Sequence, residues 1–265
     1  MKKLSKITES IWGKVLDRGA GDTVRKEDII TTNEDLRKKI LELYKEQGEG
    51  ETLDVSSLTN AIECDDFSYI FSVYTKVKYI IGLEDWDVSH VEDMHGMFMG
   101  CKNFNADLSK WDVSKVENME GMFKECKKFN SDLSKWNVSS VGDMNEMFEG
   151  CEKFNSDLSN WDVRSVKHLG SMFDGCKKFN SDLSKWDVSG VKNMNFMFYN
   201  CENFNSDLSN WNVSNVKRME YMFYNCYNFN SDLSNWHVSG VGDMEDMFHN
   251  CKSLEQIPSW YKKYL

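Results

Sequence analysis

Residues 94–141 read MHGMFMGCKNFNADLSKWDVSKVENMEGMFKECKKFNSDLSKWNVSSV, and this stretch decides the fold because one 25-residue pattern occurs in it twice. The pattern fills most of the chain, with its tryptophans at Trp86, Trp111, Trp136, Trp161, Trp186, Trp211 and Trp236. Its cysteines recur at Cys101, Cys126, Cys151, Cys176, Cys201, Cys226 and Cys251. A single unit of this length cannot bury its own apolar face and stacks on its neighbour. The sequence therefore predicts a solenoid of stacked coils.

The first half of each copy predicts a short helix. Val91, Met94, Phe98 and Cys101 follow the +3, +4, +3 spacing of one helix face. A serine precedes this run as a potential N-cap, and the residue before the cysteine is Gly or Asn in six of seven copies. Gly and Asn tolerate the left-handed conformation that ends many helices. We expect a helix over about 90–99 in the first complete copy.

The second half of each copy, FNADLSKWDV in the first complete copy, predicts a short strand and a turn, because apolar and polar residues alternate around its tryptophan. Stacked copies of such a strand would form a parallel sheet with a spacing of about 4.8 Å. We expect eight side chains of each coil to point inward, and in the first copy these are Phe104, Leu108, Trp111, Val113, Val91, Met94, Phe98 and Cys101.

Two degenerate copies flank the array. In the first, Asp66 aligns with Asp93, and at the far end Leu254, Ile257 and Trp260 continue the register with one residue missing. Atypical end units are expected, because a terminal coil exposes one face to water. The predicted organisation is an N-terminal helical segment or cap (1–53), a degenerate first repeat (54–85), the repeat array (86–251) and a C-terminal cap (252–265).

The N-terminal segment differs from the repeats. NEDLRKKILELYKEQGEG predicts a helix with Asn33 as N-cap, Leu36, Ile40 and Tyr44 on one face, and Gly48 as its stop. The earlier stretch SKITESIWGKVLDR predicts a shorter amphipathic helix. The whole segment is expected either to cap the first coil or to act as an attachment arm.

The consensus W-D/N-V-S-x-V-x-x-M-x-x-M-F-x-x-C-x-x-F-N-x-D-L-S, carried by residues 54–260, resembles the BspA-like leucine-rich repeats in their 25-residue mycoplasma-type variant. The resemblance implies an α/β repeat solenoid, a leucine-rich-repeat-like right-handed stack with one short parallel strand and one short helix per coil. It also implies a surface, adhesion or interaction protein. The segments ESIWGKVLDR and RKED, between Glu9 and Asp28, resemble a leader on proteins of gut bacteria and their phages.

The net charge of −11 is concentrated in the repeats, so their surface repels phosphate and disfavours nucleic acid and anionic membranes. No apolar run is long enough to span a bilayer, and the start of the chain has no apolar signal region. We therefore expect no membrane insertion. The expected location is the cytoplasm or a larger assembly, with surface exposure only by a route that needs no such signal.

A column of aspartates is the most distinctive polar feature: Asp107, Asp132, Asp157, Asp182, Asp207 and Asp232. Stacked carboxylates repel one another unless something intervenes. They could accept backbone N–H groups in a turn, as could the asparagine column that starts at Asn105, and this is the preferred interpretation. They could instead pair with Lys110, Lys135 and Lys185, or bind calcium. The predicted interaction face consists of this column with Ser109, Lys110, Ser134 and Lys135.

The remaining residues favour architecture over chemistry. The cysteines predict a ladder of reduced, buried thiols, the methionines predict core filler, and the tryptophans predict burial rather than sugar stacking. No catalytic motif or metal-ligand spacing occurs, so we expect no enzyme activity, cofactor or metal. The predicted function is a non-enzymatic interaction or adhesion protein that binds a protein or glycan. The alternative is a structural spacer of a cell-surface or virion assembly, attached through residues 1–53.

In two columns of equivalent positions the residue type changes most from one repeat to the next, and these columns are expected to tune the choice of partner. One column contains His90, Lys115, Gly190 and Asn215. The other contains Gly121, Glu146, Phe196 and Tyr221.

Overall fold

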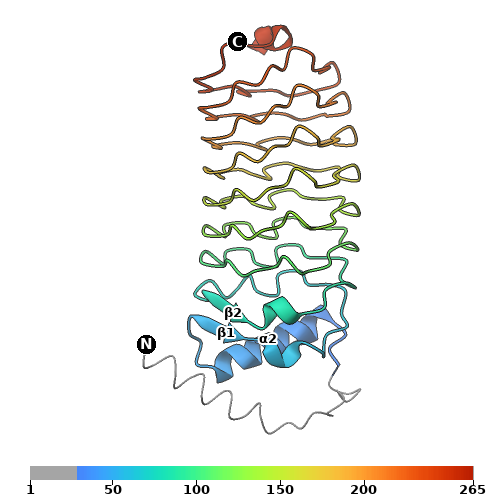
Figure 1. The fold of residues 1–265 in the computed structure, drawn as a ribbon, viewed down its shortest axis with the longest axis vertical. Coiled ribbons are helices and arrows are strands. Elements are labelled where there is room, and N and C mark those ends of the chain that lie inside the picture. Colours follow the sequence, from blue (N-terminus) through green and yellow to red (C-terminus); the bar gives the residue numbers. More distant parts are fainter. Residues whose placement is uncertain (1–28, 265) are drawn as a thin grey trace.

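The computed structural model describes residues 29–264 and shows successive coils stacked along one axis (Figure 1). The predicted helix in SKITESIWGKVLDR lies outside the described residues. Regular elements are confined to the two ends of the described chain: α2 (Asn33–Glu46), β1 (Thr52–Asp54), η2 (Ser56–Leu58), β2 (Tyr79–Ile81), η3 (Leu83–Asp85) and η4 (Ser259–Tyr264). Strands β1 and β2 form a two-stranded parallel sheet in which Leu53 lies opposite Ile80.

Helix α2 covers the first coil, but it begins one residue earlier than predicted. Thr32 is the N-cap, and its hydroxyl accepts the Asp35 N–H at 3.2 Å. The Asn33 amide is used elsewhere, because it donates to the carbonyls of Asp66 and Ser68 at 3.1 and 3.0 Å. The helix is therefore anchored to the neighbouring coil. Its fully buried residues are Leu36 and Ile40.

The predicted helix over about 90–99 is wrong, because this segment carries the hydrogen bonds between coils. The N–H of Met94 donates to the carbonyl of Asn118 at 3.0 Å, and that of Phe98 to Met122 at 2.9 Å. The amides between them close local turns, as Met97 N–H does on the Met94 carbonyl at 3.2 Å. Isolated parallel bridges run through the same segment of each coil, from Asp66 to Asp243. Half of the amides thus serve the stack and half serve the turns.

Left-handed residues explain why a helix cannot form here. Gly96 and Gly100 have φ values of +57° and +77°, and equivalent residues in the later coils are also left-handed. The left-handed conformation expected before each cysteine is confirmed, although it lies between turns and not at a helix end. Consecutive tight turns return an apolar side chain to the interior every three or four residues, which produces the same spacing as a helix face.

The predicted strand in FNADLSKWDV is also wrong for the complete copies, which show no backbone pairing between coils in this segment. In the degenerate first repeat the equivalent segment does contain a strand, β2, which pairs with β1. Trp111 N–H donates to the Leu108 carbonyl at 3.1 Å, so a turn brings Leu108 and Trp111 to the same side. Side chains make the bridges between coils here. The Asn105 Oδ1 atom accepts Asn130 N–H at 2.7 Å, and Ser156 Oγ accepts Leu133 N–H at 3.1 Å.

The predicted inward positions are confirmed by their burial. All eight in the first complete copy are at most 5% exposed. Phenylalanine rings stack along the axis, as Phe123 does on Phe148 at 5.7 Å between ring centroids. Polar atoms of the tryptophan and cysteine columns pair between coils: Trp136 Nε1 donates to the Leu108 carbonyl at 3.0 Å, and the Cys126 thiol to the Phe98 carbonyl at 3.0 Å. The expected free, buried thiols are confirmed for all but Cys251, which is partly exposed.

Modified coils close both ends of the repeats. At the N-terminal end Asp66 bridges Asp93, the residue with which it aligns in sequence. At the C-terminal end Trp260 stacks on Trp236 at 6.2 Å, and Tyr261 is 3% exposed. Ile257 is 38% exposed and so departs from the inward register expected of it.

Candidate interaction face

All six aspartates of the predicted face are exposed, and each closes the same small turn. Asp107 Oδ1 accepts the N–H of Ser109 at 2.9 Å, and the five later copies repeat this distance. Hydrogen bonds from the Ser109 side chain and amide hold the pKa of the Asp107 carboxyl below its ordinary value. The preferred interpretation of the aspartate column, turn hydrogen bonding, is confirmed.

The other two interpretations of the aspartate column have no support in the geometry. Within residues 29–264, no ion pair closer than 4.0 Å joins a face aspartate to Lys110, Lys135 or Lys185. In the same part of the chain, no group of three or more His, Cys, Asp or Glu residues is arranged to hold a metal ion. Each coil therefore presents a fixed carboxylate, and in three coils an exposed lysine follows it.

The asparagine column beside the face connects the coils. From Asn105 to Asn205, each Asn Oδ1 accepts the N–H of the asparagine one coil later, at 2.7 to 2.8 Å, and Asn230 Oδ1 accepts the Glu255 N–H at 3.0 Å. These bonds run along the stack. The prediction that the asparagines accept N–H groups within a turn is therefore wrong. They fix the spacing between successive copies of the face.

A second row of turn-closing side chains was missed by sequence reasoning. Asp87 Oδ1 accepts the Ser89 N–H at 3.0 Å, and Asp112 does the same for Ser114 at 3.0 Å. Asparagine replaces aspartate at Asn137 without loss of the bond. The signal was present in each D/N-V-S sequence, but the serine had been interpreted as a helix N-cap. The repeat surface consequently has a second row of oxygen acceptors in addition to the predicted face.

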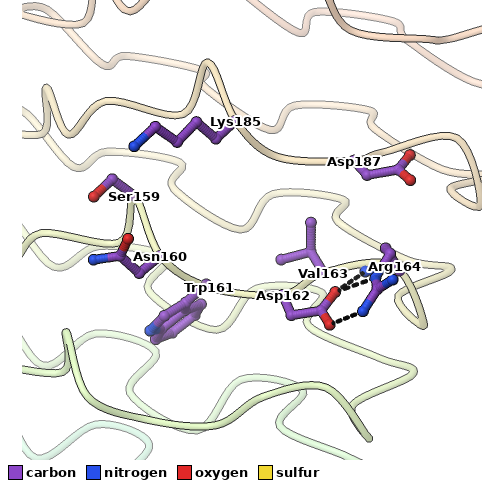
Figure 2. Close-up of a pocket in the computed structure, with 8 residues that line it drawn as sticks. All are labelled: Ser159, Asn160, Trp161, Asp162, Val163, Arg164, Lys185 and Asp187. Carbon is purple, nitrogen blue, oxygen red and sulfur yellow. Dashed lines mark hydrogen bonds and ion pairs between the residues drawn. The ribbon is translucent and has the colours of Figure 1, made fainter.

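Arg164 replaces the serine in this second row, and its N–H still donates to Asp162 Oδ1 at 3.2 Å. Its guanidinium donates to both carboxylate oxygens of Asp162, from Nε at 2.8 Å and from Nη2 at 2.6 Å. A shallow, open depression of about 320 Å³ lies beside this pair, between two successive coils (Figure 2). Its sides carry Ser159, Asn160 and Lys185 on one flank and Asp162, Arg164 and Asp187 on the other. Opposite charges on adjacent side chains leave it without a preference for cation or anion.

The two variable columns differ in what they do. In the first, His90 Nε2 lies 3.0 Å from the Cys64 carbonyl and Asn215 Nδ2 donates to the Ser189 carbonyl at 2.8 Å. These side chains bridge coils. The second column contains Glu146, Phe196 and Tyr221, all with their side chains at the surface.

Charged side chains occupy the surface around the second column in the central coils. Lys124 Nζ lies 2.7 Å from Glu146 and 2.9 Å from Glu149. Asp174, one coil after Glu149, forms no such ion pair with residues 29–264. Burial, and then repulsion by Glu149, raises the pKa of Asp174 to about 7. This surface is therefore charged and pH-sensitive in the middle of the array.

Comparison with known proteins gives a family and nothing finer. A family model described as Mycoplasma protein of unknown function, DUF285, matches residues 65–182 and 156–261. No curated protein and no solved structure matches the chain. Within residues 29–264, no helix combines the length and the apolar composition needed to cross a bilayer.

Proposed function

Because the chain belongs to the DUF285 family of Mycoplasma proteins of unknown function, we propose its role from its surface: a non-enzymatic interaction or adhesion protein that presents a long acidic and polar face to a protein or glycan. The observation that carries the proposal is the repetition of one exposed, turn-fixed aspartate in six successive coils. Preorganised groups lose little conformational entropy on binding, which favours recognition.

The fold class is part of the same proposal. We interpret the stack as a right-handed, BspA-like leucine-rich-repeat solenoid, in which tight turns replace the helix and strand of each coil. The uninterrupted Phe, Trp and Cys columns support a solenoid, because each copy contacts its own equivalents in the adjacent coils. Translational copies place many like groups in a row, which suits extended recognition better than catalysis.

The test compares two triple variants of the full chain. The first neutralises the face by Asp132→Asn, Asp157→Asn and Asp182→Asn, which keeps the Oδ1 acceptor of each turn. The control neutralises the second row by Asp112→Asn, Asp162→Asn and Asp187→Asn, where Asn137 and Asn212 already occur naturally. Immobilised proteins are used to capture partners from a lysate and from a glycan array, and bound species are quantified against the unmodified chain.

We expect the amount of captured partner to fall at least tenfold with the face variant and to stay unchanged with the control. Equal capture by both variants and the unmodified chain would contradict recognition through the predicted face. The same outcome would favour the alternative proposal, a structural spacer attached through residues 1–53.

A further inference from the structure

Five aromatic side chains gather on the surface of the last three complete coils, at Phe196, Tyr199, Tyr221, Tyr224 and His249, and we call them the aromatic patch. They form two parallel stacks. Phe196 lies on Tyr221 with 4.8 Å between ring centroids, and Tyr199 lies on Tyr224 at 4.9 Å. His249 continues the second stack, 4.6 Å from Tyr224. The four phenylalanine and tyrosine rings are partly exposed, and His249 is exposed.

Two residues of the patch are held in an unfavourable backbone conformation. Phe196 and Tyr221 have φ values of +56° and +58°, a region in which bulky side chains are outliers. The equivalent residues Gly96 and Gly121 adopt φ of +57° without that cost. A Cβ at Gly121 would meet no atom closer than 3.8 Å, so space does not require glycine in that coil, whereas a Cβ at Gly96 would collide with the Tyr69 ring. Strain of this kind typically persists where a side chain serves a function.

The stacking decides which ligand the rings suit. Phe196 and Tyr221 lie within 15° of parallel, so each covers one face of the other, and the same holds at 16° for Tyr199 and Tyr224. A sugar ring stacks on an open aromatic face, and the inner faces are already occupied. What remains are ring edges, phenolic hydroxyls and the outer faces of the stacks, which resemble the tyrosine-rich centres of protein–protein interfaces.

An acidic side chain occupies the next coil position at one end of each stack. Asp174 precedes Tyr199 by one coil in the same column, and Asp246 follows Tyr221 by one coil. Glu245 lies beside Asp246. Burial raises the pKa of the Tyr221 phenol, and the Glu245 carboxylate raises it further. A guanidinium or ammonium group on these outer faces would meet a π surface and a carboxylate together.

Two further observations favour a cation. Glu220, next to Tyr221, is 5% exposed; one of its carboxylate oxygens pairs with Arg218, and the other has no hydrogen-bond partner among residues 29–264. In the same coils Lys252 Nζ already lies over the Tyr227 ring, 4.8 Å from its centroid. The end of the array thus has one buried carboxylate oxygen that lacks a partner among residues 29–264 and one aromatic ring that receives an ammonium group.

We propose that the aromatic patch is a docking surface for an arginine- or lysine-rich segment of a partner protein, seated on the outer ring faces and held by the flanking carboxylates. The proposal rests on the proposed interaction function and assigns it a second surface, separate from the aspartate face. The charge complementarity between the acidic border and a basic segment selects this occupant over a glycan or a second copy of this acidic chain.

The test begins with selection of a phage-displayed library of random twelve-residue peptides against the full chain. Selection is followed by depletion on the variant Phe196→Gly/Tyr221→Gly. This variant removes one of the two stacks and copies Gly96 and Gly121, so its melting temperature is expected to equal or exceed that of the unmodified chain. The control, Glu146→Gly/Ser171→Gly, changes the same column at φ of +58° and +54° outside the patch.

We expect the enriched peptides to contain more Arg and Lys than Asp and Glu. Their dissociation constants, measured by fluorescence anisotropy, should rise at least tenfold for the patch variant and less than twofold for the control. A second variant, Tyr199→Lys/Tyr224→Lys, introduces the residue found at Lys124 in that column and should abolish binding. Absence of enrichment, neutral or acidic peptides, or equal affinity for the patch variant would overturn the proposal. Binding of a β-linked glucohexaose to the unmodified chain but not to the patch variant would also overturn the proposal, in favour of a glycan ligand.

This outcome is separable from that of the aspartate face. The selected peptides are also measured with the face variant Asp132→Asn/Asp157→Asn/Asp182→Asn, which should change their affinity less than twofold. If the lysate partner is lost with the face variant and kept with the patch variant, the patch proposal fails and the proposed function stands.

Discussion

Removal of one ring from the middle of the phenylalanine column should cost far more than removal of a ring from the surface. Phe148 is fully buried and stacks on Phe123 at 5.7 Å, on Phe173 at 5.8 Å and on Phe154 at 4.0 Å. Phe148→Ala therefore leaves a cavity between three rings that the hydrogen bonds between coils prevent from closing. We expect a loss of about 3–5 kcal/mol in the free energy of unfolding.

Phe196→Ala is the matched control, two coils away. Its ring is partly exposed and stacks on one neighbour in the same column, and alanine is less hindered than phenylalanine at φ of +56°. We expect a loss below about 1.5 kcal/mol. Urea unfolding followed by tryptophan fluorescence measures both values, and amide exchange locates the damage.

The exchange experiment tests the stack directly. Each coil contacts only its neighbours, so Phe148→Ala should weaken protection most in the coils that contain Phe123 and Phe173. Protection at the more distant Phe229 should change less. A loss below about 1 kcal/mol for Phe148→Ala, or equal losses for the two variants, would refute the continuous buried column.

Three other predictions follow from single groups. Asn155→Ala removes the acceptor for Asn180 N–H and should lower the free energy of unfolding by about 1 kcal/mol. Asn155→Asp keeps an acceptor oxygen and should lose less stability than the alanine variant. Equal losses for the two variants in urea unfolding would count against the asparagine ladder. Because burial raises the folded pKa of Asp174 to about 7 against about 3.9 in an unfolded chain, ionisation removes stability as the pH rises through this window, and Asp174→Asn should stabilise the protein at pH 8 and give little gain at pH 4. Melting curves at both pH values check this, and an equal gain at pH 4 would contradict it. Burial raises the pKa of the Cys151 thiol and its copies, so an aromatic disulfide reagent at pH 8 should modify the partly exposed Cys251 first and the remaining thiols only on unfolding; simultaneous native labelling would contradict the buried ladder.

Periodicity predicted which side chains are buried but not the backbone that buries them. The positions of Phe98, Leu108 and Trp111 follow from apolar spacing, because any chain that repeats every 25 residues must return the same side chains to its interior. The spacing of three and four residues does not distinguish a helix from consecutive turns. The informative signal was Gly96 and Gly121 at the same position, since a recurring glycine in a supposed helix indicates positive φ.

The aspartate face was predictable for a different reason. Asp107 and Ser109 are close in sequence, so their hydrogen bond depends on local geometry and not on how the coils stack. The asparagine ladder joins residues 25 positions apart, and only the structure shows that each side chain accepts a hydrogen bond from the next coil and not from its own turn. Local chemistry could therefore be inferred from the sequence, whereas contacts between coils could only be listed as alternatives.

The backbone also determines where the array can vary. In the segment that starts at Met94, alternate amides are donated to the next coil whichever side chain accompanies them. The position of Gly96 therefore accepts Glu146, Phe196 or Tyr221 at the cost of a strained φ but without loss of a bond between coils. The inward columns have no such freedom, because a change in one ring alters its contacts with the coils on both sides. A repeat built in this way keeps its architecture uniform while a single column carries charge in one part of its length and aromatic rings in another, and that column is where a partner-specific surface would develop.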